Sequence, residues 1–184
     1  SNLISKIPDG KSLAAGLKSL ISLRLDLNPL VEAPSSLFEL PSLRELSLKN
    51  CKLARISIPD SPISPIRTLE LDDNSLEELP PRISLLPLRI LSVPNNRLSR
   101  IPDSILAVPS LKEVHASHNF IQSIPPLRFV ETLEVSHNSI ACLPSSWFEE
   151  SVTTPPLSVL QLQSNRIKEI PDNFVIKFPS LSVL

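Results

Sequence analysis

The amino-acid sequence predicts an α/β solenoid, a fold in which short strands from successive repeats stack into one parallel sheet. The first observation is a recurring frame, Leu-x-x-Leu-x-Leu-x-x-Asn-x-Leu, whose clearest copy runs from Leu20 to Leu30. Self-similarity at a period of 20 to 50 residues is typical of solenoids. The frame returns in phase at Leu43, Ile66, Leu88, Leu111, Val130, Leu157 and Leu181, at intervals of 23, 23, 22, 23, 19, 27 and 24 residues.

The second observation is the phasing of proline, which occurs 20 times against only 2 glycines. Proline fixes φ and donates no backbone hydrogen bond, so it belongs in turns outside the sheet. We therefore expect each repeat to return along the outside in short extended, turn-like or 3₁₀ segments. Seven prolines follow the strand unit at the same short distance: Pro8, Pro34, Pro80, Pro102, Pro125, Pro144 and Pro171.

Each repeat is expected to begin with a short strand, such as Leu69-Glu70-Leu71. Alternation along a strand places its leucines on one face and the intervening residues on the other. One such strand cannot bury its apolar face alone, so neighbouring repeats pair in parallel and share a leucine core.

The asparagine of the frame is expected to be structural. After the strand the chain turns inward, and a side-chain amide offers both a donor and an acceptor to the backbone groups buried there. In the second repeat Cys51 takes this place. The expected ladder consists of Asn28, Asn74, Asn96, Asn119, Asn138 and Asn165.

Three repeats depart from the frame. The second carries Pro62 and Pro65, which predicts an irregular outer segment. The fifth is short, and the sixth has extra length at 149–156, which predicts a protruding outer loop. Trp147 aligns with outer positions such as Ile83 and Ile105. We interpret it as part of the core on the convex side, with a partner-binding hot spot as the alternative.

Composition excludes several classes of protein. The net charge of −1 argues against a nucleic-acid binder, which needs a basic face. The apolar runs are too short for membrane insertion. Cys51 and Cys142 lie four repeats apart and are not expected to pair, and the chain has no Asn-x-Ser/Thr sequon. These features favour a reducing, cytoplasmic location.

The domain organisation is predicted to be simple. Residues 1–184 form one domain of about seven full repeats with partial repeats at both ends. Solenoids need polar caps on their terminal repeats, and neither end of this sequence has the pattern of one. The sequence therefore indicates a fragment of a larger protein.

The repeat frame resembles that of the leucine-rich repeat family over essentially the whole chain. The Leu-x-x-(Leu/Ile)-Pro pattern after the asparagine is similar to the intracellular class, which includes the Ras-group scaffolds and the repeat arms of Roco-type GTPase-kinases. This resemblance implies a right-handed horseshoe with a parallel concave sheet and an irregular or 3₁₀ convex side. It also implies that the chain binds proteins.

The polar strand positions are the candidate partner-binding residues. Glu70, Asp72 and Asp73 cluster in the third repeat, and a basic series follows the opening leucine of four repeats. We interpret them as an acidic floor and a basic rim that steer a charged partner; the alternative is a solvated face of mixed charge. The predicted contact residues on the concave face are Arg24, Glu45, Glu70, Asp72, Asp73, His115 and Glu134, and those on the rim are Arg44, Arg67, Arg89 and Lys112.

No catalytic, cofactor or metal site is predicted. The sequence contains no glycine-rich phosphate loop, no Cys-x-x-Cys, no His-Glu-x-x-His and no Gly-x-Ser-x-Gly. His118 and His137 fall in one column, and two adjacent imidazoles could share a divalent metal with help from a carboxylate. The ordinary polar turn of the repeat is the preferred interpretation of these histidines.

These observations predict a non-catalytic protein–protein interaction module of an intracellular signalling or scaffold protein, which binds a partner on its concave face. The alternative is the ligand-sensing ectodomain of a receptor. The sequence does not specify the partner protein or the oligomeric state.

Overall fold

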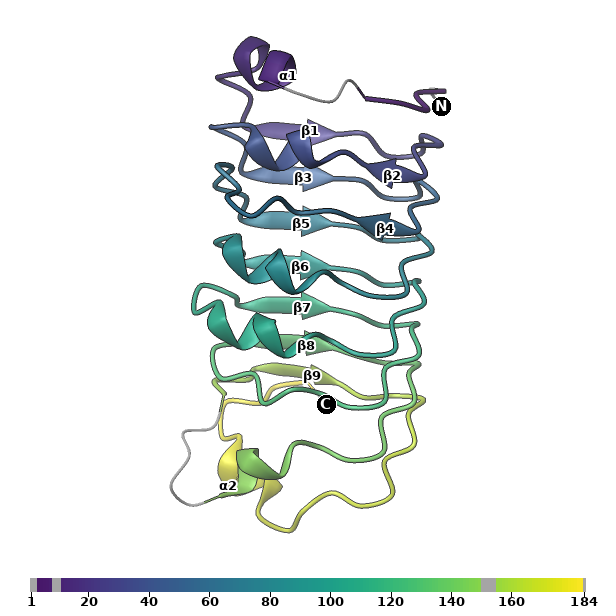
Figure 1. Cartoon of the computed structure of the whole chain (residues 1–184). Helices are drawn as coiled ribbons and strands as arrows, with labels where there is room; N and C mark the ends of the chain where they lie inside the picture. The colour runs from purple at the N-terminus through teal and green to yellow at the C-terminus, as the bar shows by residue number, and fades with distance from the viewer. Residues whose placement is uncertain (1–2, 8–10, 150–154, 184) are drawn as a thin grey trace.

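The strands of successive repeats form one parallel sheet of seven strands, which confirms the predicted solenoid (Figure 1). The structure is a computed structural model that describes residues 3–7, 11–149 and 155–183. Each strand begins one residue earlier than expected; the strand predicted to start at Leu69 starts at Thr68. In spatial order the strands are β1 (Ser22–Arg24), β3 (Glu45–Ser47), β5 (Thr68–Glu70), β6 (Ile90–Ser92), β7 (Glu113–His115), β8 (Thr132–Glu134) and β9 (Val159–Gln161).

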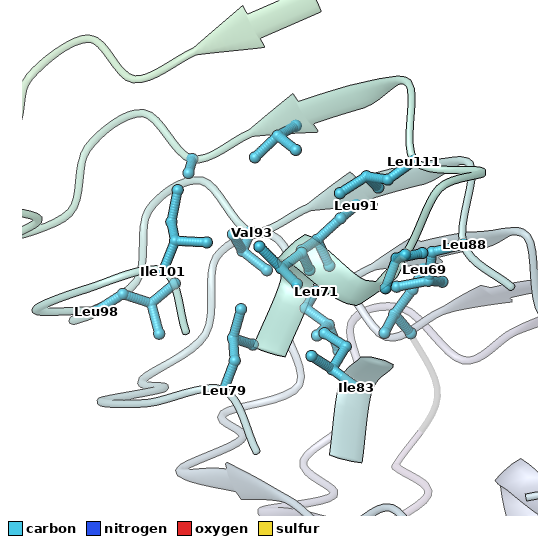
Figure 2. Packing of buried hydrophobic residues seen from close by; sticks show 14 of the residues in the cluster. Leu69, Leu71, Leu79, Ile83, Leu88, Leu91, Val93, Leu98, Ile101 and Leu111 are labelled. Carbon is cyan, nitrogen blue, oxygen red and sulfur yellow. The ribbon is translucent and has the colours of Figure 1, made fainter. Parts of the chain in front are cut away.

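The core lies behind this sheet, because every strand pairs in register with the equivalent strand of the next repeat. Leu46 pairs with Leu69, and Leu69 pairs with Leu91. These three side chains are at most 1% exposed. Figure 2 shows Leu69 and Leu91 packed with outer residues such as Ile83. Burial of one leucine contributes about 1.5–3 kcal/mol, so repetition of a small unit builds one continuous core.

The convex side is formed mainly by short 3₁₀ helices, as the proline phasing predicts. Pro34, Pro80, Pro102 and Pro144 precede four of them in extended or near-extended conformation. Ile83 of η2 and Ile105 of η3 point into the core and are at most 1% exposed, whereas Leu85 and Leu106 of the same segments face solvent. The outer elements are α1 (Lys11–Gly16), η1 (Ser35–Glu39), η2 (Pro81–Leu85), η3 (Asp103–Ala107), η4 (Ser145–Phe148) and α2 (Phe174–Lys177).

Two of the three irregular repeats, the second and the fifth, lack an outer helix, which agrees with the irregular outer segment predicted for the second. Residues 57–66 and 120–131 contain no helix. A second, two-stranded parallel sheet, which the frame did not predict, joins β2 (Glu32–Ala33) to β4 (Arg55–Ile56). Residues 150–154 of the predicted outer loop lie outside the described residues.

Trp147 lies in the convex core, as its alignment predicts. It is 1% exposed and meets Phe178 edge to face, with ring centroids 5.6 Å apart. Phe174 and Phe148 complete an aromatic cluster between η4 and α2. A side chain this buried cannot be a direct partner-binding hot spot.

Candidate protein-interaction face

The concave face is the face of the seven-stranded sheet that points away from the core, and its central column is fixed by strand register. Each member of this column pairs with the equivalent residue of the next repeat, as Glu70 does with Ser92 and His115 does with Glu134. Polar residues from all seven strands therefore lie side by side. The column reads Arg24, Ser47, Glu70, Ser92, His115, Glu134 and Gln161.

A second column, just beyond the strands, has left-handed backbone conformation in every repeat. Its φ values lie between 51° and 60°. Among residues other than glycine, Asn, Asp and His are the most enriched in this conformation, and five of the seven residues of this column are Asn, Asp or His. The backbone therefore accounts for these side chains without invoking a ligand. The column reads Leu27, Asn50, Asp73, Asn95, His118, His137 and Ser164.

The predicted acidic cluster is partly neutralised by a lysine. The Lys49 ammonium lies 2.7 Å from Glu70 Oε1 and 3.1 Å from Asp72 Oδ2. Partial burial lowers the pKa of Lys49, but its hydrogen bonds to the two carboxylates and their charges outweigh burial, so the pKa is raised above its usual value. Asp72 also accepts a 2.6 Å hydrogen bond from Ser92 Oγ. Asp72 therefore helps to hold neighbouring strands together, and a charge reversal there would disturb the fold as well as the surface.

A shallow hollow of about 440 Å³ lies on the concave face beside this lysine. Its walls come from β5 to β8 and carry the carboxylates of Glu70, Asp72, Glu113 and Glu134. His115 lies between two of them: its Nδ1 is 2.7 Å from Glu134 Oε2, and its Nε2 is 3.5 Å from Glu113 Oε2. The hollow is thus a surface suited to a cationic side chain.

The acidic and histidine residues of this hollow were predictable from the sequence with one exception. Glu70, Asp72, His115 and Glu134 are among the predicted contact residues, whereas Glu113 is not. Glu113 occupies the first position of β7, in the same row of the sheet as Glu45 of β3, so the repeat alignment contained the signal.

The remaining predicted contact residues lie apart from the hollow. Arg24 and Glu45 are exposed on β1 and β3, towards the N-terminal end of the sheet. Asp73 is exposed in the left-handed column next to Asp72. These three side chains do not line the hollow, so the predicted concave set divides into a central group and an outlying group.

The predicted rim residues form a column of their own at the start of the strands. The backbone N–H of Arg67 donates to the Arg44 carbonyl at 2.8 Å, and that of Arg89 donates to the Arg67 carbonyl at 2.7 Å. Lys112 continues the series with a 2.9 Å bond to the Arg89 carbonyl. Its ammonium pairs with Glu131 at 2.9 Å.

The two histidines that share a column are in contact. The rings of His118 and His137 stack with centroids 4.2 Å apart and planes inclined by 10°. Within the described part of the chain, no group of three or more His, Cys, Asp or Glu side chains is arranged to hold a metal ion.

The asparagine column makes the backbone hydrogen bonds that its position predicts. Asn96 Oδ1 accepts the N–H of Leu76 at 3.0 Å. Its Nδ2 lies 3.0 Å from the carbonyl of Leu71 and 3.1 Å from those of Val93 and Pro94. Because Leu76 and Leu71 belong to the preceding repeat, Asn96 joins two consecutive turns of the solenoid. The same pattern recurs at Asn74, Asn119, Asn138 and Asn165, and Asn28 accepts a hydrogen bond from the N–H of Ile4.

No protein-family model and no curated protein sequence matches the chain. A solved structure of a leucine-rich repeat protein from Leptospira interrogans does match, with a TM-score of 0.64 and 22% identity over 94% of this chain. The chain folds as a leucine-rich repeat protein. This chain spans 50% of the length of that neighbour. At this identity the likeness establishes the shared fold alone.

In residues 3–7, 11–149 and 155–183, no helix has the length and apolar character needed to cross a bilayer.

Proposed function

We propose that this leucine-rich repeat chain is a non-catalytic module that binds a protein partner on its concave face. The observation that carries the proposal is the continuous polar surface made by seven strands, with the carboxylate-lined hollow near its middle. Repeat stacking produces extended surfaces of this kind, which suit large partners better than small molecules. A lysine or arginine of the partner would enter the hollow, where Glu70, Glu113 and Glu134 supply acceptors.

The arrangement of the charged groups supports a binding role rather than a catalytic one. General acid–base catalysis requires a group that is held against a substrate proton and has a suitably tuned pKa. Here the hollow is shallow, Glu70 pairs with Lys49 and Glu134 pairs with His115. These pairs leave the surface charged and polar but provide no enclosed site.

We further propose that the module belongs to a cytoplasmic signalling or scaffold protein. Cys51 and Cys142 are both free thiols. Burial raises the pKa of the Cys51 thiol, so that it stays protonated and donates to the carbonyls of Leu25 and Lys49. A thiol used as a hydrogen-bond donor within the fold suits a reducing compartment.

The test is affinity capture with two triple variants that each remove three negative charges. Glu70→Gln/Glu113→Gln/Glu134→Gln changes the hollow, whereas Glu78→Gln/Asp103→Asn/Glu169→Gln changes exposed carboxylates elsewhere. We expect the first variant to reduce recovery of a specific partner by about tenfold or more, because charged pairs across an interface strongly affect binding. Quantitative mass spectrometry of the captured proteins measures the change.

Thermal melts provide the folding control for both variants. Glutamine keeps an oxygen that can accept from Lys49 and His115, so the melting temperatures of the two triples should remain close to that of the wild type. Equal capture by the two triples would show that the partner does not use the concave face.

A further inference from the structure

The basic rim is a regular structure rather than a scatter of surface charges. Each of its carbonyls accepts two backbone N–H groups from the next repeat, as Arg44 does from Arg67 and Thr68 at 2.8 and 3.0 Å. The Arg67 carbonyl likewise accepts two hydrogen bonds from the following repeat, from the N–H groups of Arg89 and Ile90. Because this ladder fixes the backbone, the basic positions follow one another at the strand spacing of about 4.8 Å.

Three of these four cations lack a counter-ion. Arg44, Arg67 and Arg89 are exposed, and within the described part of the chain none of them forms an ion pair. Lys112 is paired with Glu131, which occupies the same rim position one repeat later. The sign of the charge therefore reverses at Glu131, and the basic series has a defined end.

We propose that this arginine ridge, formed by Arg44, Arg67, Arg89 and Lys112, binds an acidic segment of the protein partner. The segment would lie in extended conformation along the solenoid axis, across the ends of the strands. Guanidinium groups hold carboxylates in bidentate pairs. This inference rests on the proposed protein-binding function and adds the chemistry of the partner to it.

The dimensions of the ridge fit an extended peptide. Four rungs at the strand spacing cover about 14 Å from Arg44 to Lys112. In an extended chain, side chains on one face are two residues apart, so three carboxylates in the pattern Glu-x-Glu-x-Glu also cover about 14 Å. The long arginine side chains accommodate the difference between rung spacing and side-chain spacing.

The surroundings of the ridge favour a peptide over a nucleic acid. The ridge is one residue wide, and the neighbouring row of the sheet carries Glu45 and Glu113. A nucleic acid needs a broad basic face, and its phosphates would meet these carboxylates. An acidic peptide can place its charges over the ridge alone.

The experiment measures binding of a fluorescein-labelled peptide, Glu-Ser-Glu-Ser-Glu-Ser-Glu, by fluorescence anisotropy. Two double variants each remove two exposed arginines. Arg67→Gln/Arg89→Gln changes the ridge at the start of the strands, and Arg97→Gln/Arg166→Gln changes residues that follow the carboxyl ends of the strands. The ridge variant should raise the Kd by about tenfold or more, and the control variant by less than about twofold. The affinity of the wild type should fall as salt rises from about 50 to 200 mM, since exposed ion pairs are screened.

Several results would contradict the proposal that the arginine ridge binds an acidic segment. Absence of peptide binding to the wild type, equal loss in the two doubles, or equal binding of the Lys-Ser-Lys-Ser-Lys-Ser-Lys peptide would each do so. Tighter binding of a ten-residue oligothymidylate than of the acidic peptide would indicate a nucleic-acid site instead. The concave triple Glu70→Gln/Glu113→Gln/Glu134→Gln retains the whole ridge and should keep peptide binding. If the ridge fails these peptide-binding tests while partner capture still depends on the concave face, only this inference is refuted and the proposed function stands.

Discussion

Replacement of Asn96 with alanine is expected to lower the free energy of unfolding by about 1–3 kcal/mol. Asn96 is 6% exposed, and its Oδ1 is the acceptor for the buried N–H of Leu76. Alanine leaves that N–H unpaired and removes a donor shared among the carbonyls of Leu71, Val93 and Pro94. Equilibrium denaturation of the two proteins measures the difference.

The matched control is Asn50, which is exposed and has a φ of 51°. Alanine at Asn50 would carry the cost of a left-handed backbone, so the suitable control is Asn50→Gly, which should change stability by only a few tenths of a kcal/mol. Equal losses for Asn96→Ala and Asn50→Gly would contradict the assignment of the ladder.

Cys51 explains how one repeat functions without the asparagine. Its thiol donates to the carbonyls of Leu25 and Lys49 but cannot supply the oxygen acceptor of an amide. The N–H of Leu30, which would use that acceptor, instead bonds to the carbonyl of Asn28 at 2.8 Å. This local turn replaces the missing acceptor. Leu76 has no such bond to its own turn, so the loss of Asn96 is not compensated.

The features that depend on the repeat period were predictable from the sequence. The spacing of Leu46, Leu69 and Leu91 identified both the core and the strand register. Once register is known, the residue between two strand leucines must face away from the core. For this reason the sequence alone predicts the central column, including His115 and Glu134.

The features that depend on side-chain geometry or backbone detail were not predictable. The reach of Lys49 to both Glu70 and Asp72 requires particular side-chain conformations. An alignment of charges therefore gave an acidic cluster where the structure has a partly neutralised one. For His118 and His137 the sequence favoured the polar turn of the repeat over a shared metal, and their φ values of 57° and 55° agree with that interpretation. The left-handed conformation itself could not be predicted from the repeat period.

The period also explains why single substitutions in this fold should have local effects. Each repeat contacts mainly its neighbours, so stability is close to a sum of repeat and interface contributions. Trp147 provides a severe test, because η4 lies in the repeat with extra length and the aromatic partner of Trp147, Phe178, lies in the last outer segment. Damage there should not spread to β5 in the middle of the sheet.

Replacement of Trp147 with alanine is accordingly expected to cost about 3–5 kcal/mol, with the damage confined to the C-terminal repeats. The indole is 1% exposed and packs against Phe178. Because Trp147 is the only tryptophan in the chain, unfolding must be followed by circular dichroism. Hydrogen exchange should quicken in β9 and α2 and remain unchanged in β5.

Trp147→Phe separates loss of volume from loss of the indole group. Phenylalanine keeps an aromatic ring against Phe178 and removes the indole N–H, which is buried and has no hydrogen-bond partner among the described residues. An unpaired buried donor is itself unfavourable, so its removal offsets part of the packing that is lost with the larger indole ring. The phenylalanine variant should therefore lose well under half as much stability as the alanine variant. A loss below about 1 kcal/mol for Trp147→Ala, or exchange that quickens equally in β5 and β9, would show that Trp147 does not anchor a local convex core.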